Sequence, residues 1–143
     1  MDDKVKRLII AYSRINTPHI HTDIDGFNAS ETGVLWAIAQ IALAHSDTKL
    51  FSLKELNSYL NYTKPNLSQT VNKLEDKGVV ERTVLKNDRR VTYIRLTDQG
   101  LQMMNARKQC IVAKMEKVIQ RIGEENIDAV INLFEKFTEA LED

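Results

Sequence analysis

Hydrogen-bonding side chains are concentrated between residues 64 and 73 of the 143-residue chain. A helix over this stretch turns amides, a hydroxyl and amines outward, and its first acid is Glu75. The candidate contact residues are Lys64, Pro65, Asn66, Ser68, Gln69, Asn72 and Lys73. Amides can bind adenine bidentately, serine binds several base edges, and lysine binds guanine or phosphate. The pattern predicts contact with double-stranded DNA. The alternative is a solvated helix face, on which glutamate and lysine usually alternate.

A second candidate contact surface follows, between two β-branched runs at 79–85 and 91–96 that predict a two-stranded hairpin. Its tip carries Lys86, Asp88, Arg89 and Arg90. A wing of this type can place an arginine in the narrow, negative minor groove. An aspartate in a DNA-facing loop is expected to hold an arginine side chain in position, because a guanidinium can hold a carboxylate with one edge and leave donors for DNA. The alternative is that Asp88 serves only the geometry of the turn.

Local signals place a helix-turn-helix before this hairpin. Ser52 and Glu55 have the spacing of a capping box, which predicts a helix over 53–60. Asn61 suits a tight turn, and Thr63 is an N-cap for the helix that carries the polar residues. Gly78 is expected to end that helix.

Apolar residues three and four apart predict four further helices, over 4–16, 30–45, 98–122 and 124–141. Ser30 and Thr97 are the expected N-caps of the second and third of these. The predicted fold is mainly α with a small β-hairpin wing. A winged helix-turn-helix over 30–97 is joined to a helical dimerisation layer over 1–22 and 98–143, within a single domain.

The terminal helices have more apolar surface than one small core absorbs, so they are expected to meet a second copy of the chain. The candidate dimer contacts are Leu8, Ile111, Val118, Ile131, Phe134 and Phe137.

The net charge is zero, but the charge is unevenly distributed. Eight basic and four acidic residues lie between Lys64 and Arg95, whereas two basic and seven acidic residues lie between Gln120 and Asp143. This asymmetry suggests one surface that meets an anion and another that is kept away from it. The apolar runs are too short for a membrane span, and the single cysteine excludes an internal disulfide. We therefore expect a soluble, cytoplasmic protein with no membrane partner.

The segment Asp88 to Gly100 matches the wing pattern D-x-R-x5-L-T-x-x-G of the MarR family, and residues 63–78 look like the recognition helix of that family. The resemblance covers the whole chain in length and element order and is strongest from Ser52 to Gly100. It implies a bacterial or archaeal homodimeric regulator, usually a repressor, with Arg90 in the minor groove and Asp88 bracing it. It also implies a small-molecule effector that binds between the winged-helix part and the dimer helices. The chain departs from the family in a longer connection over 44–51.

Other candidates for chemistry are weaker. His19, His21 and Asp23 alternate in a loop, but a closed metal site needs about four ligands, so no metal site or cofactor is expected. Cys110 is expected to pack inertly rather than to sense oxidants, and Trp36 and Tyr12 are expected to fill the core rather than to line a ligand pocket. No catalytic motif is present, so an enzyme is not expected. The competing class is a winged helix that binds another protein rather than DNA.

Overall fold

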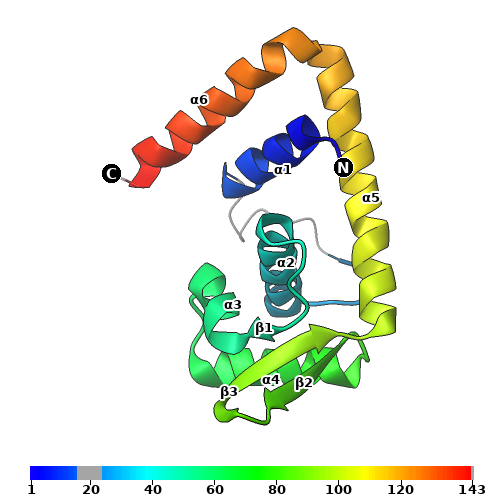
Figure 1. Ribbon diagram of the computed structural model, residues 1–143, viewed down its shortest axis with the longest axis vertical. Coiled ribbons are helices and arrows are strands. Elements are labelled where there is room, and N and C mark those ends of the chain that lie inside the picture. The colour runs from blue at the N-terminus through cyan, green and yellow to red at the C-terminus, as the bar shows by residue number, and fades with distance from the viewer. Residues whose placement is uncertain (16–23, 143) are drawn as a thin grey trace. The chain divides into compact units, whose positions relative to one another are not determined.

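The computed structural model describes residues 1–15 and 24–142, which fall into two compact units. Of these described residues, one unit is formed by 24–104 and the other by 1–15 together with 105–142. The elements, in chain order, are α1 (Asp3–Ile15), α2 (Ala29–Ala44), β1 (Phe51–Ser52), α3 (Leu53–Leu60), α4 (Lys64–Asp76), β2 (Val80–Leu85), β3 (Asp88–Leu96), α5 (Asp98–Ile122) and α6 (Glu124–Glu142). The mainly helical class with a small β wing is confirmed (Figure 1).

The N-cap of helix α2 lies two residues earlier than expected. Asn28, not Ser30, is the N-cap: its side chain accepts the N–H of Glu31, and the carboxylate of Glu31 accepts the N–H of Asn28. This is a complete capping box, and the acid three residues after Asn28 decides between two suitable caps. The prediction of Ser30 was wrong, because Ser30 has no acid at that spacing.

The helix-turn-helix is formed by α3 and α4, as expected. Ser52 accepts the N–H of Glu55 and Thr63 accepts the N–H of Asn66, so both predicted N-caps are confirmed. The turn between the helices is fixed by Asn57, whose amide donates to the carbonyl of Tyr62 and accepts its N–H. Asn61 takes the left-handed conformation at φ 59°, which asparagine tolerates better than most residues.

The predicted two-stranded hairpin is part of a three-stranded antiparallel sheet with the order β1-β3-β2. The strand that the sequence did not predict, β1, is only two residues long and pairs Phe51 with Ile94. The tip is also tighter than expected, because β3 begins at Asp88 and the turn is Lys86–Asn87. Pairing jumps from Val84 opposite Thr92 to Leu85 opposite Asp88, so residues 89–91 lie in an irregular stretch of β3.

One apolar core holds α2, α3, α4 and the sheet together. It contains the buried stripe of α4, Leu67, Val71 and Leu74, and the fully buried Ile94 of β3. Because this stripe takes one side of α4, the opposite side of the helix is left to solvent.

The two ends of the wing meet at a junction formed by Gly78, Val79, Thr97 and Gly100. The Thr97 hydroxyl donates to the Gly78 carbonyl and accepts the N–H of Gly100, which confirms Thr97 as the N-cap of α5. The Thr97 N–H also donates to the Val79 carbonyl. A Cβ atom at position 100 would lie 2.0 Å from that carbonyl oxygen, so the close approach requires glycine.

The helical unit pairs α1 with α6, which lie side by side (Figure 1). Leu8 and Ala11 pack against Ile127 and Ile131, and three surface ion pairs follow the contact: Lys4–Glu124, Arg7–Asp128 and Arg14–Glu142. The acidic C-terminal segment is thus partly neutralised by the basic α1, rather than forming an isolated negative surface as its composition suggested. No helix in the described residues is long and apolar enough to cross a membrane.

The buried carboxylate of Glu31 links the start of α2 to the end of α4. Its Oε2 atom lies 2.6 Å from the ammonium of Lys77, which also donates to the Gly26 carbonyl and lies 4.7 Å from the ring centre of Phe27. Burial alone would raise the pKa of Glu31, but the Lys77 ammonium and the Asn28 N–H together hold it below its ordinary value of 4.5.

Gly100→Ala should destabilise the fold by about 1–3 kcal/mol, because the new methyl group collides with backbone rather than with a movable side chain. Helix propensity alone predicts the opposite sign, a gain of about 1 kcal/mol. Urea denaturation measures the change. Gln102→Ala, at an exposed position on the same helix, is the control and should stay within about 0.5 kcal/mol of the parent. A stabilised Gly100→Ala variant would contradict the close approach.

Glu31→Gln should lower stability at neutral pH by about 1–3 kcal/mol, the usual contribution of a hydrogen bond to a charged group. Because the pKa of Glu31 is lowered in the folded state, its contribution is present above the unfolded value and is lost as the pH falls through the folded value. The difference between the parent and Glu31→Gln should therefore shrink below about pH 4.5. Thermal unfolding from pH 3 to pH 7 tests this, with the exposed Glu139→Gln as control. A pH-independent difference would refute the assignment.

Candidate nucleic-acid interface

Helix α4 exposes the polar face that its sequence predicts. Lys64, Pro65, Asn66, Ser68, Gln69, Asn72 and Lys73 are all exposed. Between them, Leu67, Thr70, Val71 and Leu74 are buried. The Thr70 hydroxyl donates to the Asn66 carbonyl, so its hydrogen-bonding requirement is met within the helix. The face available to a partner is therefore made of amides, a hydroxyl and amines.

The wing adds a second exposed polar surface. Lys86, Asp88, Arg89 and Arg90 are all exposed. The carboxylate of Asp88 accepts the backbone N–H of Arg90 at 3.1 Å, and no ion pair joins it to the Arg90 guanidinium in the part of the chain that the structure describes. The contact is an Asx turn, which favours the turn-forming alternative for Asp88 and leaves the guanidinium of Arg90 unbraced by it.

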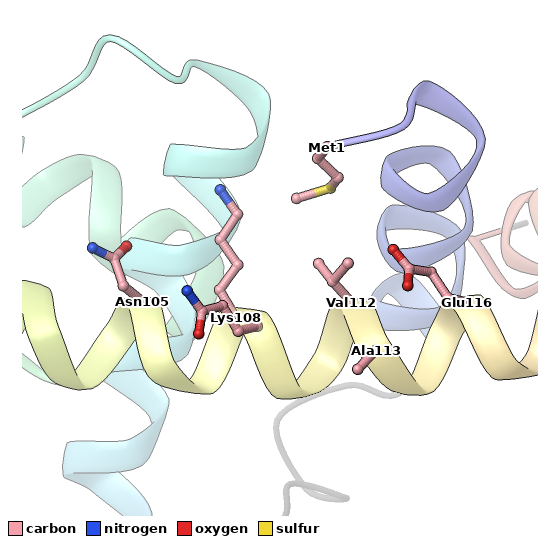
Figure 2. A pocket seen from close by; sticks show the side chains of 7 residues that line it. Met1, Asn105, Lys108, Val112, Ala113 and Glu116 are labelled. Atoms are coloured by element: carbon pink, nitrogen blue, oxygen red, sulfur yellow. The ribbon is translucent and has the colours of Figure 1, made fainter.

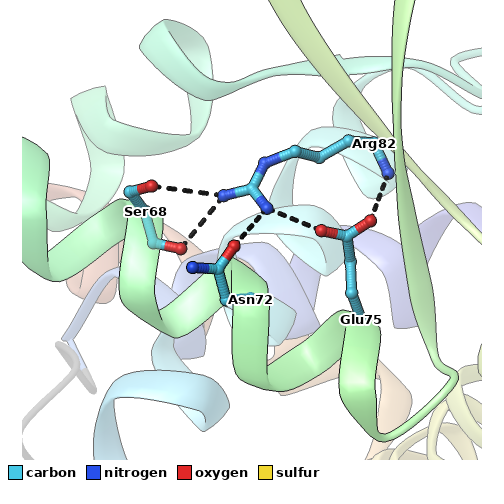
Figure 3. Close-up of polar contacts among 4 residues, drawn as sticks. All are labelled: Ser68, Asn72, Glu75 and Arg82. Atoms are coloured by element: carbon cyan, nitrogen blue, oxygen red, sulfur yellow. Dashed lines mark hydrogen bonds and ion pairs between the residues drawn. The ribbon is translucent and has the colours of Figure 1, made fainter.

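Sequence reasoning missed the residue that links the wing to α4. The guanidinium of Arg82 on β2 donates to Asn72 Oδ1, to Glu75 Oε1 at 2.6 Å, and to the carbonyl and hydroxyl oxygens of Ser68 at 3.0 and 3.3 Å (Figure 3). Glu75 also accepts the backbone N–H of Arg82. The sequence signal that could have identified this link is an acid at the end of α4, Glu75, and a base near the start of β2, Arg82, separated by the turn at Gly78.

This network changes the electrostatics of the α4 face. Glu75, the acid nearest the polar residues, is turned toward β2 and neutralised by Arg82 (Figure 3). Glu81 is likewise paired with Arg95 across the sheet. The cations Lys64, Lys73, Lys86, Arg89 and Arg90 form no ion pair within the described residues. The face and the wing therefore carry a positive excess, as an anionic partner requires.

The remaining candidates do not join this surface. His19, His21 and Asp23 lie outside the described residues, and the described residues contain no cluster of His, Cys, Asp and Glu that could hold a metal ion. Cys110 is exposed on α5, so the expectation that it packs inertly was wrong. Trp36 packs edge-to-face against Tyr59 with the ring centres 6.1 Å apart. Tyr12 is exposed on α1, so it does not fill the core as expected.

A pocket lies within the helical unit, along α5 (Figure 2). It is lined by Met1, Asn105, Lys108, Gln109, Val112, Ala113 and Glu116. Met1 extends toward Val112, and the charged ends of Lys108 and Glu116 lie on either side (Figure 2). No residue of α4 or the wing contributes to it.

The candidate dimer residues have different surroundings. Leu8 and Ile131 are fully buried between α1 and α6 of one chain, and Val118 and Phe134 pack partly buried against that cluster. Ile111 is half-buried, whereas Phe137 is 54% exposed. Phe137 lies between Leu133 and Leu141, which are 65% and 70% exposed and four residues away on either side. These three form an apolar stripe on the outer face of α6.

Comparisons with known proteins agree with this architecture. Residues 25–91 match the model of the MarR family. The chain is 24% identical over 143 residues to the HTH-type transcriptional regulator MhqR of Bacillus subtilis, covering 95% of this chain and 92% of that protein. The resemblance to the MarR family is thereby confirmed.

Several solved structures share the fold, including those of FabT and PcaV. The Streptococcus pneumoniae FabT structure, in complex with DNA, superposes with a TM-score of 0.69 at 22% identity and covers 94% of this chain and 88% of that one. The PcaV transcriptional regulator of Streptomyces coelicolor, in complex with its natural ligand, superposes with a TM-score of 0.53 at 17% identity and covers 82% and 78%.

Proposed function

We propose, from the premise that residues 25–91 are a MarR-family segment, that this chain is a homodimeric, sequence-specific DNA-binding repressor that responds to a small-molecule ligand. The observation that carries the proposal is the face of α4: seven predicted contact positions are exposed together, the nearest acid is turned away, and unpaired cations of the wing lie in the same unit. The family and the relative that this chain matches are MarR-family and HTH-type transcriptional regulators, so we assign the chain no catalytic role. Such a repressor acts in the cytoplasm, where bacterial DNA lies.

Helix α4 is the element proposed to enter the major groove, and the wing the element proposed to follow the backbone into the minor groove. In a two-fold dimer the two α4 helices read half-sites about 10 base pairs apart, so the operator is a pseudo-palindrome. The FabT structure is a complex with DNA and the PcaV structure is a complex with its natural ligand, so both kinds of partner are known for this fold. A ligand controls binding only if it prefers the DNA-incompetent dimer.

Selection of duplexes from a random pool by the purified protein tests the proposal. An enriched pseudo-palindrome, bound with an affinity that falls steeply between 50 and about 200 mM salt, is the expected result. The winged-helix protein-binding alternative predicts no enriched sequence and no such salt dependence. That outcome would reject the DNA-binding function.

Phe137→Glu should break the proposed dimer and leave a folded monomer, because Phe137 lies on the exposed stripe of α6 rather than in the core of one chain. Ile131→Glu is the matched comparison: it places a charge at a fully buried position and should unfold the helical unit. Sedimentation velocity with circular dichroism separates the two effects. A Phe137→Glu protein that is still dimeric at micromolar concentration would exclude this stripe as the interface.

Substitutions at Asp88 should separate its charge from its hydrogen bond. Asp88→Asn keeps an oxygen that can accept the Arg90 N–H and removes a negative charge near the DNA, so it should bind the selected operator at least as tightly as the parent. Asp88→Ala loses the acceptor as well and should bind several-fold more weakly, because the start of β3 is no longer fixed. Gel shifts at constant salt measure both. Weaker binding by Asp88→Asn than by the parent would show that the carboxylate itself is needed.

A further inference from the structure

The contacts of Arg82 determine which atoms of α4 face outward. A guanidinium has only N–H donors, so the amide atom of Asn72 that faces it must be the oxygen. The Asn72 amide nitrogen is then turned away from Arg82 (Figure 3), on a residue that is exposed. Asn72 therefore presents N–H donors at the surface of α4.

Ser68 is constrained in the same way. Both of its oxygens accept from one terminal nitrogen of Arg82, at 3.0 Å to the carbonyl and 3.3 Å to the hydroxyl. With the hydroxyl oxygen accepting, its hydrogen is directed elsewhere and is available as a donor. Ser68 and Asn72 are four residues apart, so these two donors lie on the same side of the helix.

The four hydrogen bonds use both terminal nitrogens of Arg82, and its charge is balanced by Glu75. Arg82 is therefore occupied within the protein and is not itself positioned as a contact to a base. Its effect on a partner passes through the side chains that it holds.

We propose that Arg82 is a positioning residue that makes α4 read hydrogen-bond acceptors, namely the N7 and O6 atoms of a guanine, through Asn72 and Ser68. An unconstrained asparagine instead pairs bidentately with adenine, which needs both a donor and an acceptor. This inference rests on the proposed DNA-binding function and specifies the base edge that the same surface recognises.

The test uses the full-length protein and its selected operator, in which each guanine is replaced singly by 7-deazaguanine and, separately, each G·C pair by A·T. The parent should lose about tenfold in affinity at one guanine per half-site, the size of one good base contact. Asn72→Ala should bind the unmodified operator more weakly and should be insensitive to 7-deazaguanine at that position.

Arg82→Lys is the decisive variant, because it keeps the positive charge but cannot hold Asn72, Ser68 and Glu75 together. Its preference for guanine over adenine at that position, measured as the ratio of the two affinities, should fall about tenfold, and the salt dependence of binding should stay unchanged. Arg95→Lys is the matched control, since Arg95 pairs with Glu81 on the same sheet and, within the described residues, forms no hydrogen bond or ion pair with α4. It should leave the preference intact. Should Arg82→Lys fail to fold, Asn72→Asp keeps an acceptor for Arg82, removes the outward donor, and should lose the same preference.

The possible failures are distinguishable. If the parent selects no sequence, the proposed function fails and the inference fails with it. If the parent selects an operator but Arg82→Lys keeps the preference of the parent for guanine, or weakens binding equally on all sequences, the proposed function stands and the role of Arg82 is overturned. A loss confined to the guanine position supports it.

Discussion

The winged-helix unit depends on one backbone junction, at which the chain leaves α4 and later returns to begin α5. The Thr97 hydroxyl joins the Gly78 carbonyl to the Gly100 N–H, and the backbone of Gly100 lies against the Val79 carbonyl. This contact closes the sheet beside the end of α4 and begins the next helix at the same point. The register of β2 on β3 then places Arg82 over the outer side of α4. The polar face is therefore oriented by the closure of the wing as well as by the apolar stripe beneath it.

Features of this unit that depend only on residues close together in the sequence could be predicted from it. The caps Ser52, Thr63 and Thr97 each accept the N–H three residues later, so their spacing suffices to place them. Strand β1 could not be predicted, because two residues carry no periodicity and it is defined only by its pairing with a strand about forty residues later. The role of Arg82 could not be predicted for the same reason, because its partners on α4 become its neighbours only after the wing has folded back onto that helix.

The helical unit shows a different limit. Periodicity correctly identified apolar stripes on the terminal helices, but a stripe does not reveal which apolar surface it will meet. Ile131 and Phe137 lie on one helix within two turns, yet the first is fully buried against α1 and the second is exposed. Internal packing and assembly both use leucine, isoleucine and phenylalanine, so composition cannot separate them. Only the position of α1 on α6 decides which of these residues are left exposed.

Net charge was similarly uninformative, because it counts charges without regard to their partners. Within the winged-helix unit Glu31 is held by Lys77, Glu75 by Arg82 and Glu81 by Arg95, while Asp88 accepts a backbone N–H. The acids of α6 are partly paired with cations of α1. Exposed pairs of this kind add little stability, but each removes a negative charge from the field that an approaching polyanion meets. A chain with a formal charge of zero can therefore present a positive, donor-rich helix face, because several of its acids, Glu75 and Glu81 among them, are engaged by partners inside the protein.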